Sequence, residues 1–218
     1  MKYIDIANNE EINAYLKKGD ANLGQLGFTD HSKAHCVMVA YQAGRILEKF
    51  GYSEHEIELA KIAGYMHDIG NAINRNHHAE YGALLANDLL KETNMSLEDR
   101  INIISAIGNH DESTGNPEDF ISAALIIADK TDVRRSRVRQ KEKSTFDIHD
   151  RVNYAVTDSK LNIEQDKSLI TLELQIDENI CSMFDYFEIF LGRMMLCRKS
   201  AESLETRFRL TVNGHKVL

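Results

Sequence analysis

MHDIGN, residues 66–71, places a histidine beside an aspartate at the end of an apolar segment. The segment opens on Ser53 and Glu56, whose spacing is that of a capping box, so a helix is predicted from there toward His67. Gly70 follows where that helix should end. The His67-Asp68 doublet therefore lies at a helix end that borders the predicted core.

Other histidines occupy comparable positions along the chain. His35 falls in the first turn of the preceding predicted helix, His78 opens the following one, and His110 ends the one after that. Asp129 closes the apolar run FISAALIIAD, residues 120–129. A buried carboxylate without a partner carries a large desolvation cost, which a metal ion removes.

This set of side chains predicts a metal centre. Imidazole and carboxylate ligands together suit iron, manganese, nickel or zinc. One or two divalent ions are expected, with the ligands His35, His67, Asp68, His78, His110 and Asp129. Six ligands exceed the need of one tetrahedral ion, and Asp68 is the predicted bridge between two. Two ions about 3.5–4 Å apart could share a hydroxide and polarise a phosphoryl oxygen.

The order of these residues resembles the HD-domain superfamily of metal-dependent phosphohydrolases over about residues 31–135. HCVMVA resembles that family's opening histidine helix, MHDIGN its central doublet, and IADKTD its closing aspartate. The matches fall on His35, His67, Asp68 and Asp129, the family's basic four-residue metal site. The resemblance implies a helical domain that binds divalent metal and cleaves phosphate esters.

Two further segments resemble binuclear members related to the HD-GYP branch, which degrades cyclic dinucleotides. They are HAEYGA, from His78, and NHDESTGNP, from Asn109. The chain departs from the full signature, since Asn109 replaces the first histidine of a pair, Asn116-Pro117 replaces Tyr-Pro, and Asn71 replaces a lysine. The departures argue against cyclic-dinucleotide cleavage but leave a second metal open, through His78 and His110.

The predicted catalytic residues are Asp68, Asp111 and Lys130. Asp111 is a candidate proton donor because it follows His110, although the alternative of an ordinary loop aspartate is slightly favoured. Lys130 and Arg134 share a face if the helix continues, and both are predicted to bind substrate phosphate. The basic run that goes on to Lys143 is predicted to be a solvated helix end. The histidines interpreted as surface residues are His31, His55, His149 and His215.

The leading hypothesis is hydrolysis of a nucleotide or related small phosphate ester by a metal-activated water. One alternative is a di-iron oxygenase, because HD relatives such as myo-inositol oxygenase are similar in holding two irons with four histidines and two aspartates. Another is a regulatory module that senses a nucleotide without catalysis, which the departures at Asn71 and Asn109 leave open.

The composition of the chain argues against several classes of protein and cellular compartment. The net charge of −8 argues against a general nucleic-acid binder. Three cysteines without a CxxC pair exclude a disulfide framework and a zinc ribbon, and they indicate a reducing cytoplasm. No signal peptide is visible, and no apolar stretch approaches the roughly 20 residues that span a bilayer, so no membrane partner is expected.

The expected fold is mostly α, with an HD-type helical bundle over residues 1–150 and a small α+β subdomain over 151–218. Residues 20–28 are expected to form a loop, and Asn116 to cap the helix that Pro117 begins. After residue 150, alternating patterns predict strands at 154–163 and 170–176, a helix over 179–203 and a last strand around 208–212. The result is a β-β-α-β unit, whose Met- and Phe-rich helix stripe is core or a homodimer contact.

Overall fold

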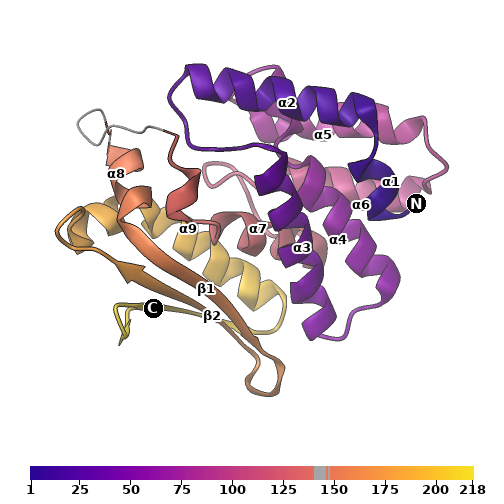
Figure 1. Cartoon of the computed structure of the whole chain (residues 1–218). Helices are drawn as coiled ribbons and strands as arrows, with labels where there is room; N and C mark the ends of the chain where they lie inside the picture. The colour runs from indigo at the N-terminus through magenta and orange to yellow at the C-terminus, as the bar shows by residue number, and fades with distance from the viewer. Residues whose placement is uncertain (140–145, 147) are drawn as a thin grey trace.

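The computed structural model describes residues 1–139, 146 and 148–218, with the side chains of 148, 149 and 167 left aside. Helices dominate, and a small sheet follows them in the chain (Figure 1). The mostly α class with a C-terminal α+β part is therefore confirmed. The elements are α1 Tyr3–Ala7, α2 Glu10–Gln25, α3 Lys33–Lys49, α4 Glu54–Met66, the 3-10 turn η1 Ile69–Ala72, α5 His78–Lys91, α6 Leu97–Gly108, α7 Phe120–Lys130, η2 Arg135–Arg137, α8 Ile148–Ala155, β1 Val156–Glu164, η4 Gln165–Lys167, β2 Leu169–Ile176, α9 Met183–Ser203, β3 Arg207–Val212 and β4 His215–Lys216.

Short polar side chains start the helices that carry the predicted site. The Ser32 hydroxyl accepts from the backbone of Ala34 at the start of α3. Ser53 and Glu56 form the predicted capping box of α4, and Ser96 caps α6. These caps satisfy backbone N–H groups that no helix can satisfy itself, which fixes where each helix begins.

Two predicted boundaries are wrong. Residues 20–25 continue α2 instead of forming a loop, with Gly19 inside the helix. A Cβ at Gly19 would lie 3.1 Å from the backbone nitrogen of Ala72, so this glycine allows α2 to approach η1 closely. At α7 the cap is Asp119 rather than Asn116, because the Asp119 carboxylate accepts from the backbone of Ser122 at 2.7 Å.

The prediction that α7 continues into a solvated basic tail is also wrong. The helix ends at Lys130, and the Thr131 hydroxyl donates back to the Ile127 carbonyl at 2.6 Å. Arg137 is buried and donates to the carbonyls of Asp30 and Asp132, at 2.9 and 2.8 Å. The segment therefore folds against the loop before α3, and Lys141 and Lys143 lie outside the described residues.

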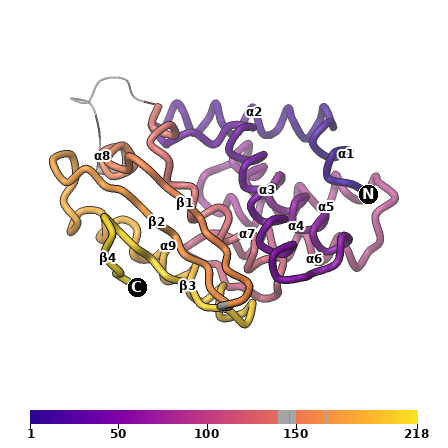
Figure 2. The backbone as a smooth tube through the Cα atoms, turned by 60° about the horizontal axis from the view of Figure 1, so that its bottom comes forward, coloured from indigo at the N-terminus to yellow at the C-terminus, as the bar shows by residue number. Residues whose placement is uncertain are grey.

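The sheet has the strand order β1-β2-β3-β4, in which only the β2–β3 pair is parallel. Helix α9 connects β2 to β3, as a parallel pair requires. The predicted β-β-α-β unit is therefore present, with the short β4 added. Figure 2 shows the sheet on one side of the molecule, α1–α6 on the other, and α9 beside α7 between them.

The predicted domain division at residue 150 falls inside α8. One buried apolar cluster extends across it, from Ile6 and Val39 in the helical part to Phe190 on α9 and Leu210 on β3. The division stays a prediction. In the part of the chain that is described, no helix is long and apolar enough to cross a membrane.

Gly70 determines how closely the His67-Asp68 doublet approaches α5. A Cβ at this position would lie 2.0 Å from the carbonyl oxygen of His78 and 2.5 Å from the backbone nitrogen of Gly82. Both atoms belong to the backbone and cannot rotate away. The absence of a side chain at Gly70 therefore allows His78 to lie next to the His67-Asp68 pair.

Gly70→Ala is expected to lower the free energy of unfolding by about 3 kcal/mol, the upper range for overpacking, and to reduce metal content. Urea denaturation and metal analysis measure the two effects. Gly192→Ala on α9 is the control, because no atom lies within 4 Å of the added methyl group. It should raise stability by up to about 1 kcal/mol through helix propensity. Equal stability of Gly70→Ala and the native protein would contradict this packing argument.

Candidate metal centre

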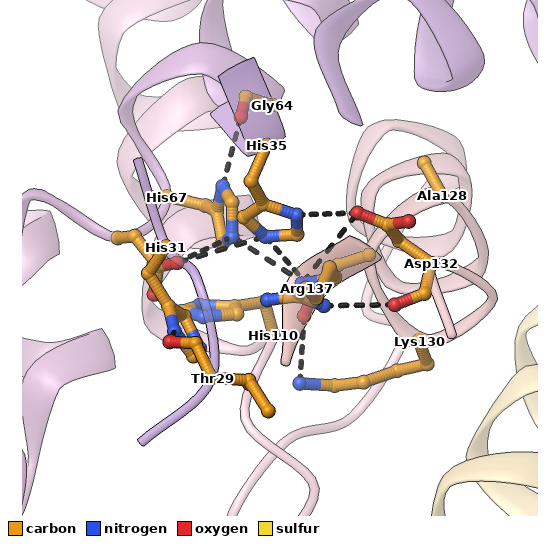
Figure 3. Close-up of polar contacts among 12 residues, drawn as sticks. Thr29, His31, His35, Gly64, His67, His110, Ala128, Lys130, Asp132 and Arg137 are labelled. Atoms are coloured by element: carbon orange, nitrogen blue, oxygen red, sulfur yellow. Dashed lines mark hydrogen bonds and ion pairs between the residues drawn. The ribbon is translucent and has the colours of Figure 1, made fainter. Parts of the chain in front are cut away.

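The six predicted ligands lie together at the ends of five helices. His35 is in the first turn of α3, His78 begins α5, and Asp129 is in the last turn of α7. The Nε2 atom of His67 lies 3.2 Å from Asp68 Oδ2 and 3.6 Å from Asp129 Oδ1. His35 Nε2 lies 3.3 Å from the same Asp129 oxygen. Helices far apart in sequence thus contribute to one cluster, part of which Figure 3 shows.

Each of the four histidines has its Nδ1 atom against an acceptor. His67 Nδ1 donates to the carbonyl of Gly64 at 2.8 Å, and His110 Nδ1 to that of Ile107 at 2.7 Å. His78 Nδ1 lies 3.1 Å from the carbonyl of Arg75, and His35 Nδ1 lies 2.8 Å from Asp132 Oδ2.

A carbonyl or carboxylate oxygen can only accept, so all four Nδ1 atoms carry the proton. The four Nε2 atoms are left for a ligand, and those of His78 and His110 lie 3.2 Å apart. Protein groups that hold Nδ1–H in this way are the usual outer partners of metal-binding histidines.

Two buried atoms of the cluster have no hydrogen-bond partner. They are His35 Nε2 and Asp68 Oδ2, which lie 3.7 Å apart. An unsatisfied buried polar atom costs about 1–3 kcal/mol, and a bound cation would satisfy both at once. The donor set and these two atoms therefore fit a divalent metal ion.

In the described part of the chain, two groups of three side chains have ligand atoms within 4.8 Å of one another. They are His35, His67 and Asp129, and His67, Asp68 and His110. His78 joins neither group, but its Nε2 atom lies 3.8 Å from Asp68 Oδ1. The cluster can thus hold a metal, while the individual ligands and the number of ions remain predictions.

Charged groups of the cluster shift the pKa values of their neighbours. Burial alone would raise the pKa of Asp129, but Lys130 and the nearby imidazoles of His35 and His67 hold that pKa well below its usual range. Burial alone would lower the pKa of His67, but Asp68 and Asp129 raise it to about 10. Burial, with His67 and His78 nearby, lowers the pKa of His110 to about 3. Without metal, the proton between the two carboxylates therefore resides on His67.

Sequence reasoning missed Asp132, which holds His35 in place. Its carboxylate is buried, and it also accepts from the guanidinium of Arg134 at 2.6 and 3.1 Å. The signal was present in the sequence, as a second aspartate three residues after Asp129. Arg134, predicted to bind substrate, is directed at Asp132 and does not line the cavity beside the cluster, so its role stays a prediction.

Lys130 does face the cluster. Its Nζ atom lies 2.7 Å from Asp129 Oδ2 and 2.9 Å from Glu112 Oε2, and Glu112 Oε1 accepts from Arg193 Nε at 3.0 Å. Neither Glu112 nor Arg193, which lies on α9, was predicted to belong to the site. Together with Asp68 they line a cavity of about 380 Å³. The C-terminal part of the chain therefore supplies one wall of the site.

The interpretation of His31 as a surface residue is wrong. Its ring lies 5.6 Å from that of His35 and lines the same cavity, and Thr29 accepts from its Nδ1 atom at 2.7 Å. His55 and His215 are exposed as expected, and the side chain of His149 lies outside the described residues.

Asp111 lies beside the cluster, with Oδ2 3.6 Å from His78 Nε2, and lines a second hollow of about 420 Å³. Burial alone would raise its pKa, but hydrogen bonds from the hydroxyl and backbone of Ser113 lower it. An ionised carboxylate accepts protons at neutral pH, so the predicted donor role of Asp111 needs a change of environment and stays a prediction.

Asp132→Asn is expected to weaken metal binding about 10- to 100-fold, because His35 loses its charged Nδ1 acceptor. Isothermal titration with Zn²⁺ or Mn²⁺ measures the change. Asp99→Asn is the matched control, since it alters another aspartate–histidine pair, Asp99 with the exposed His55 at 2.7 Å. If both variants bind metal as the native protein does, Asp132 has no orienting role.

Metal binding at pH 7 is expected to release about one proton. The pKa of His67 is raised to about 10, so the metal-free imidazole is charged at pH 7, and ligation requires the neutral form. Apparent affinity should therefore rise with pH, by up to about tenfold per unit below pH 10. Calorimetry in buffers of different ionisation enthalpy counts the protons, and a value near zero would show that His67 is neutral or not a ligand.

Parts of this sequence are similar to known proteins. The family model for the HD domain matches residues 33–155, which is more than half of the chain. The uncharacterized protein MJ1020 of Methanocaldococcus jannaschii is 28% identical over 173 residues, 68% of this chain and 66% of that protein. Ribonuclease Y of Lawsonia intracellularis is 31% identical over 111 residues, 49% of this chain and 20% of the ribonuclease. The chain thus spans just under two thirds of the first relative and a fifth of the second.

Among solved structures, a predicted HD superfamily hydrolase from an uncultured Thermotogales bacterium is 22% identical, with a TM-score of 0.46. The similarity covers 57% of this chain and 67% of that one. From the match of the HD domain model over residues 33–155, the chain belongs to the HD-domain family.

Proposed function

We propose that this protein is a metal-dependent phosphohydrolase that acts on a nucleotide or a related small phosphate ester. One observation carries the proposal. The Nε2 atoms of four oriented histidines lie around the carboxylates of Asp68 and Asp129, and this cluster borders a cavity that basic side chains also line. Membership of the HD-domain family supports hydrolase chemistry at such a site.

The protein side chains bind and orient. Divalent ions bound by the cluster would supply Lewis acidity and a water nucleophile near neutral pH. Lys130 faces the same cavity, where its ammonium offsets negative charge on phosphoryl oxygens. Asn71 donates to the carboxylate of Asp68 at 2.8 Å and to its carbonyl at 3.0 Å, and thereby fixes the predicted bridging ligand.

The cavity favours a small substrate. Its volume of about 380 Å³ is within the range of ligand pockets, and its walls combine Leu26, Phe28 and Phe190 with several cations. An anionic group attached to an apolar or planar body fits such walls. The name of Ribonuclease Y indicates action on RNA, but the net charge of −8 favours a small molecule over a polymer here.

A di-iron oxygenase is the second candidate, because the cluster offers four histidines and two aspartates. The two functions differ in their need for redox-active metal. Activity with Mn²⁺ or Zn²⁺ under nitrogen supports hydrolysis, whereas dioxygen uptake by the iron form alone supports oxygenation.

Protein loaded separately with Mn²⁺, Fe²⁺, Co²⁺, Ni²⁺ or Zn²⁺ is expected to release phosphate, or a nucleotide product, from members of a broad phosphate-ester panel. His35→Ala should reduce the rate about a thousandfold, equivalent to the several kcal/mol that a metal supplies. His55→Ala, at an exposed histidine, should leave the rate unchanged. Inactivity of every metal form on the whole panel would contradict the proposal.

A further inference from the structure

Most cations that line the 380 Å³ cavity are already held by acidic groups. Lys130 lies between Asp129 and Glu112, at 2.7 and 2.9 Å, and Arg193 donates to Glu112 at 3.0 Å. Arg137 lies 3.7 Å from the Asp132 carboxylate. Each of these three cations therefore already has an acidic partner inside the protein.

Arg75 differs from these cations. Its Nη1 atom lies 3.3 Å from His78 Nε2, and its guanidinium lies 5.4 Å from the centre of the Phe28 ring. Within the described ranges 1–139, 146 and 148–218, no carboxylate lies at ion-pair distance from it. Among the residues that the structure describes, Arg75 is thus a cation of the cavity without an acidic partner.

Arg75 also lies where the two hollows meet the cluster. It lines both the 380 Å³ cavity and the 420 Å³ hollow, as do Phe28, His78 and Glu112. The acceptor that it contacts, His78 Nε2, is one of the atoms predicted to bind metal. Ligation would take that lone pair, and the guanidinium would then need another acceptor at the same place.

We propose that Arg75 binds the phosphoryl oxygens of the substrate at the metal cluster, the role that sequence reasoning gave to Arg134. This inference rests on the proposed phosphohydrolase function. A guanidinium without a counter-ion can donate two parallel hydrogen bonds to a phosphate, which an ammonium cannot. Arg134 already uses this geometry on Asp132 and does not line the cavity.

The proposed role belongs to the side chain of Arg75, whereas its structural role toward His78 belongs to the backbone. His78 Nδ1 is held by the carbonyl of Arg75, which every substitution keeps. Replacing the side chain therefore keeps this hydrogen bond to His78 Nδ1 and removes the guanidinium, with its charge and its contacts to His78 Nε2 and Phe28.

The test measures binding of inorganic phosphate to the Mn²⁺-loaded protein by isothermal titration. Arg75→Gln is expected to weaken binding 10- to 100-fold, the range for a hydrogen-bonded charged group. Arg75→Lys keeps the positive charge but cannot donate two parallel hydrogen bonds, so its affinity for phosphate should lie between those of the native protein and Arg75→Gln. Arg198→Gln is the matched control, because this exposed arginine of α9 pairs with Glu202 at 3.2 Å, and it should bind phosphate within about threefold of the native protein. Metal content should be equal in all four proteins.

On a cleaved ester, Arg75→Gln should raise KM by a similar factor. The inference is overturned if the loaded native protein binds no phosphate, or if Arg75→Lys and Arg75→Gln bind it as tightly as the native protein. If Arg75→Gln loses metal or does not fold, unchanged binding by Arg75→Lys overturns it. Phosphate binding that depends on Arg75, without cleavage of any ester, would contradict the proposed hydrolysis and leave the inference standing.

Discussion

The acceptors that hold the Nδ1 atoms of four histidines are the constraint on which the site depends. Three are carbonyls of the same chain segment as the histidine, and the fourth is the carboxylate of Asp132. They direct four Nε2 atoms at the carboxylates of Asp68 and Asp129, an arrangement that concentrates negative charge and lone pairs in one place. The raised pKa of His67 and the unpartnered Asp68 oxygen are consequences of that concentration. A cation is the group that such a cluster binds best.

The rest of the fold brings helix ends to this cluster. Gly70 permits contact between the His67-Asp68 doublet and α5, and the end of α7 at Lys130 brings Asp129 and Asp132 to the same side. The chain of contacts from Asp129 through Lys130 and Glu112 to Arg193 then joins the cluster to α9. The C-terminal part of the chain is therefore part of the site, where it supplies a wall of the cavity.

Residues whose role depends on local pattern could be predicted from sequence. Helix caps at Ser53 and Ser96, the alternation of β2, and histidines at helix ends are local signals, and they placed all six candidate ligands in one cluster. Residues whose role depends on tertiary contact could not. The end of α7, the fold of Arg137 against the loop before α3, and the position of His31 depend on partners remote in sequence. Periodicity contains no information about such contacts.

Anomalous diffraction from crystals of the Zn²⁺-loaded protein tests the central claim most directly. We expect at least one anomalous peak about 2.0–2.2 Å from the Nε2 atoms of His35 and His67 and from a carboxylate oxygen of Asp129. A binuclear centre would add a second peak about 3.5–4 Å away, on the side of His78 and His110. Absence of a peak within the cluster, or ligation through Nδ1 instead of Nε2, would contradict the account.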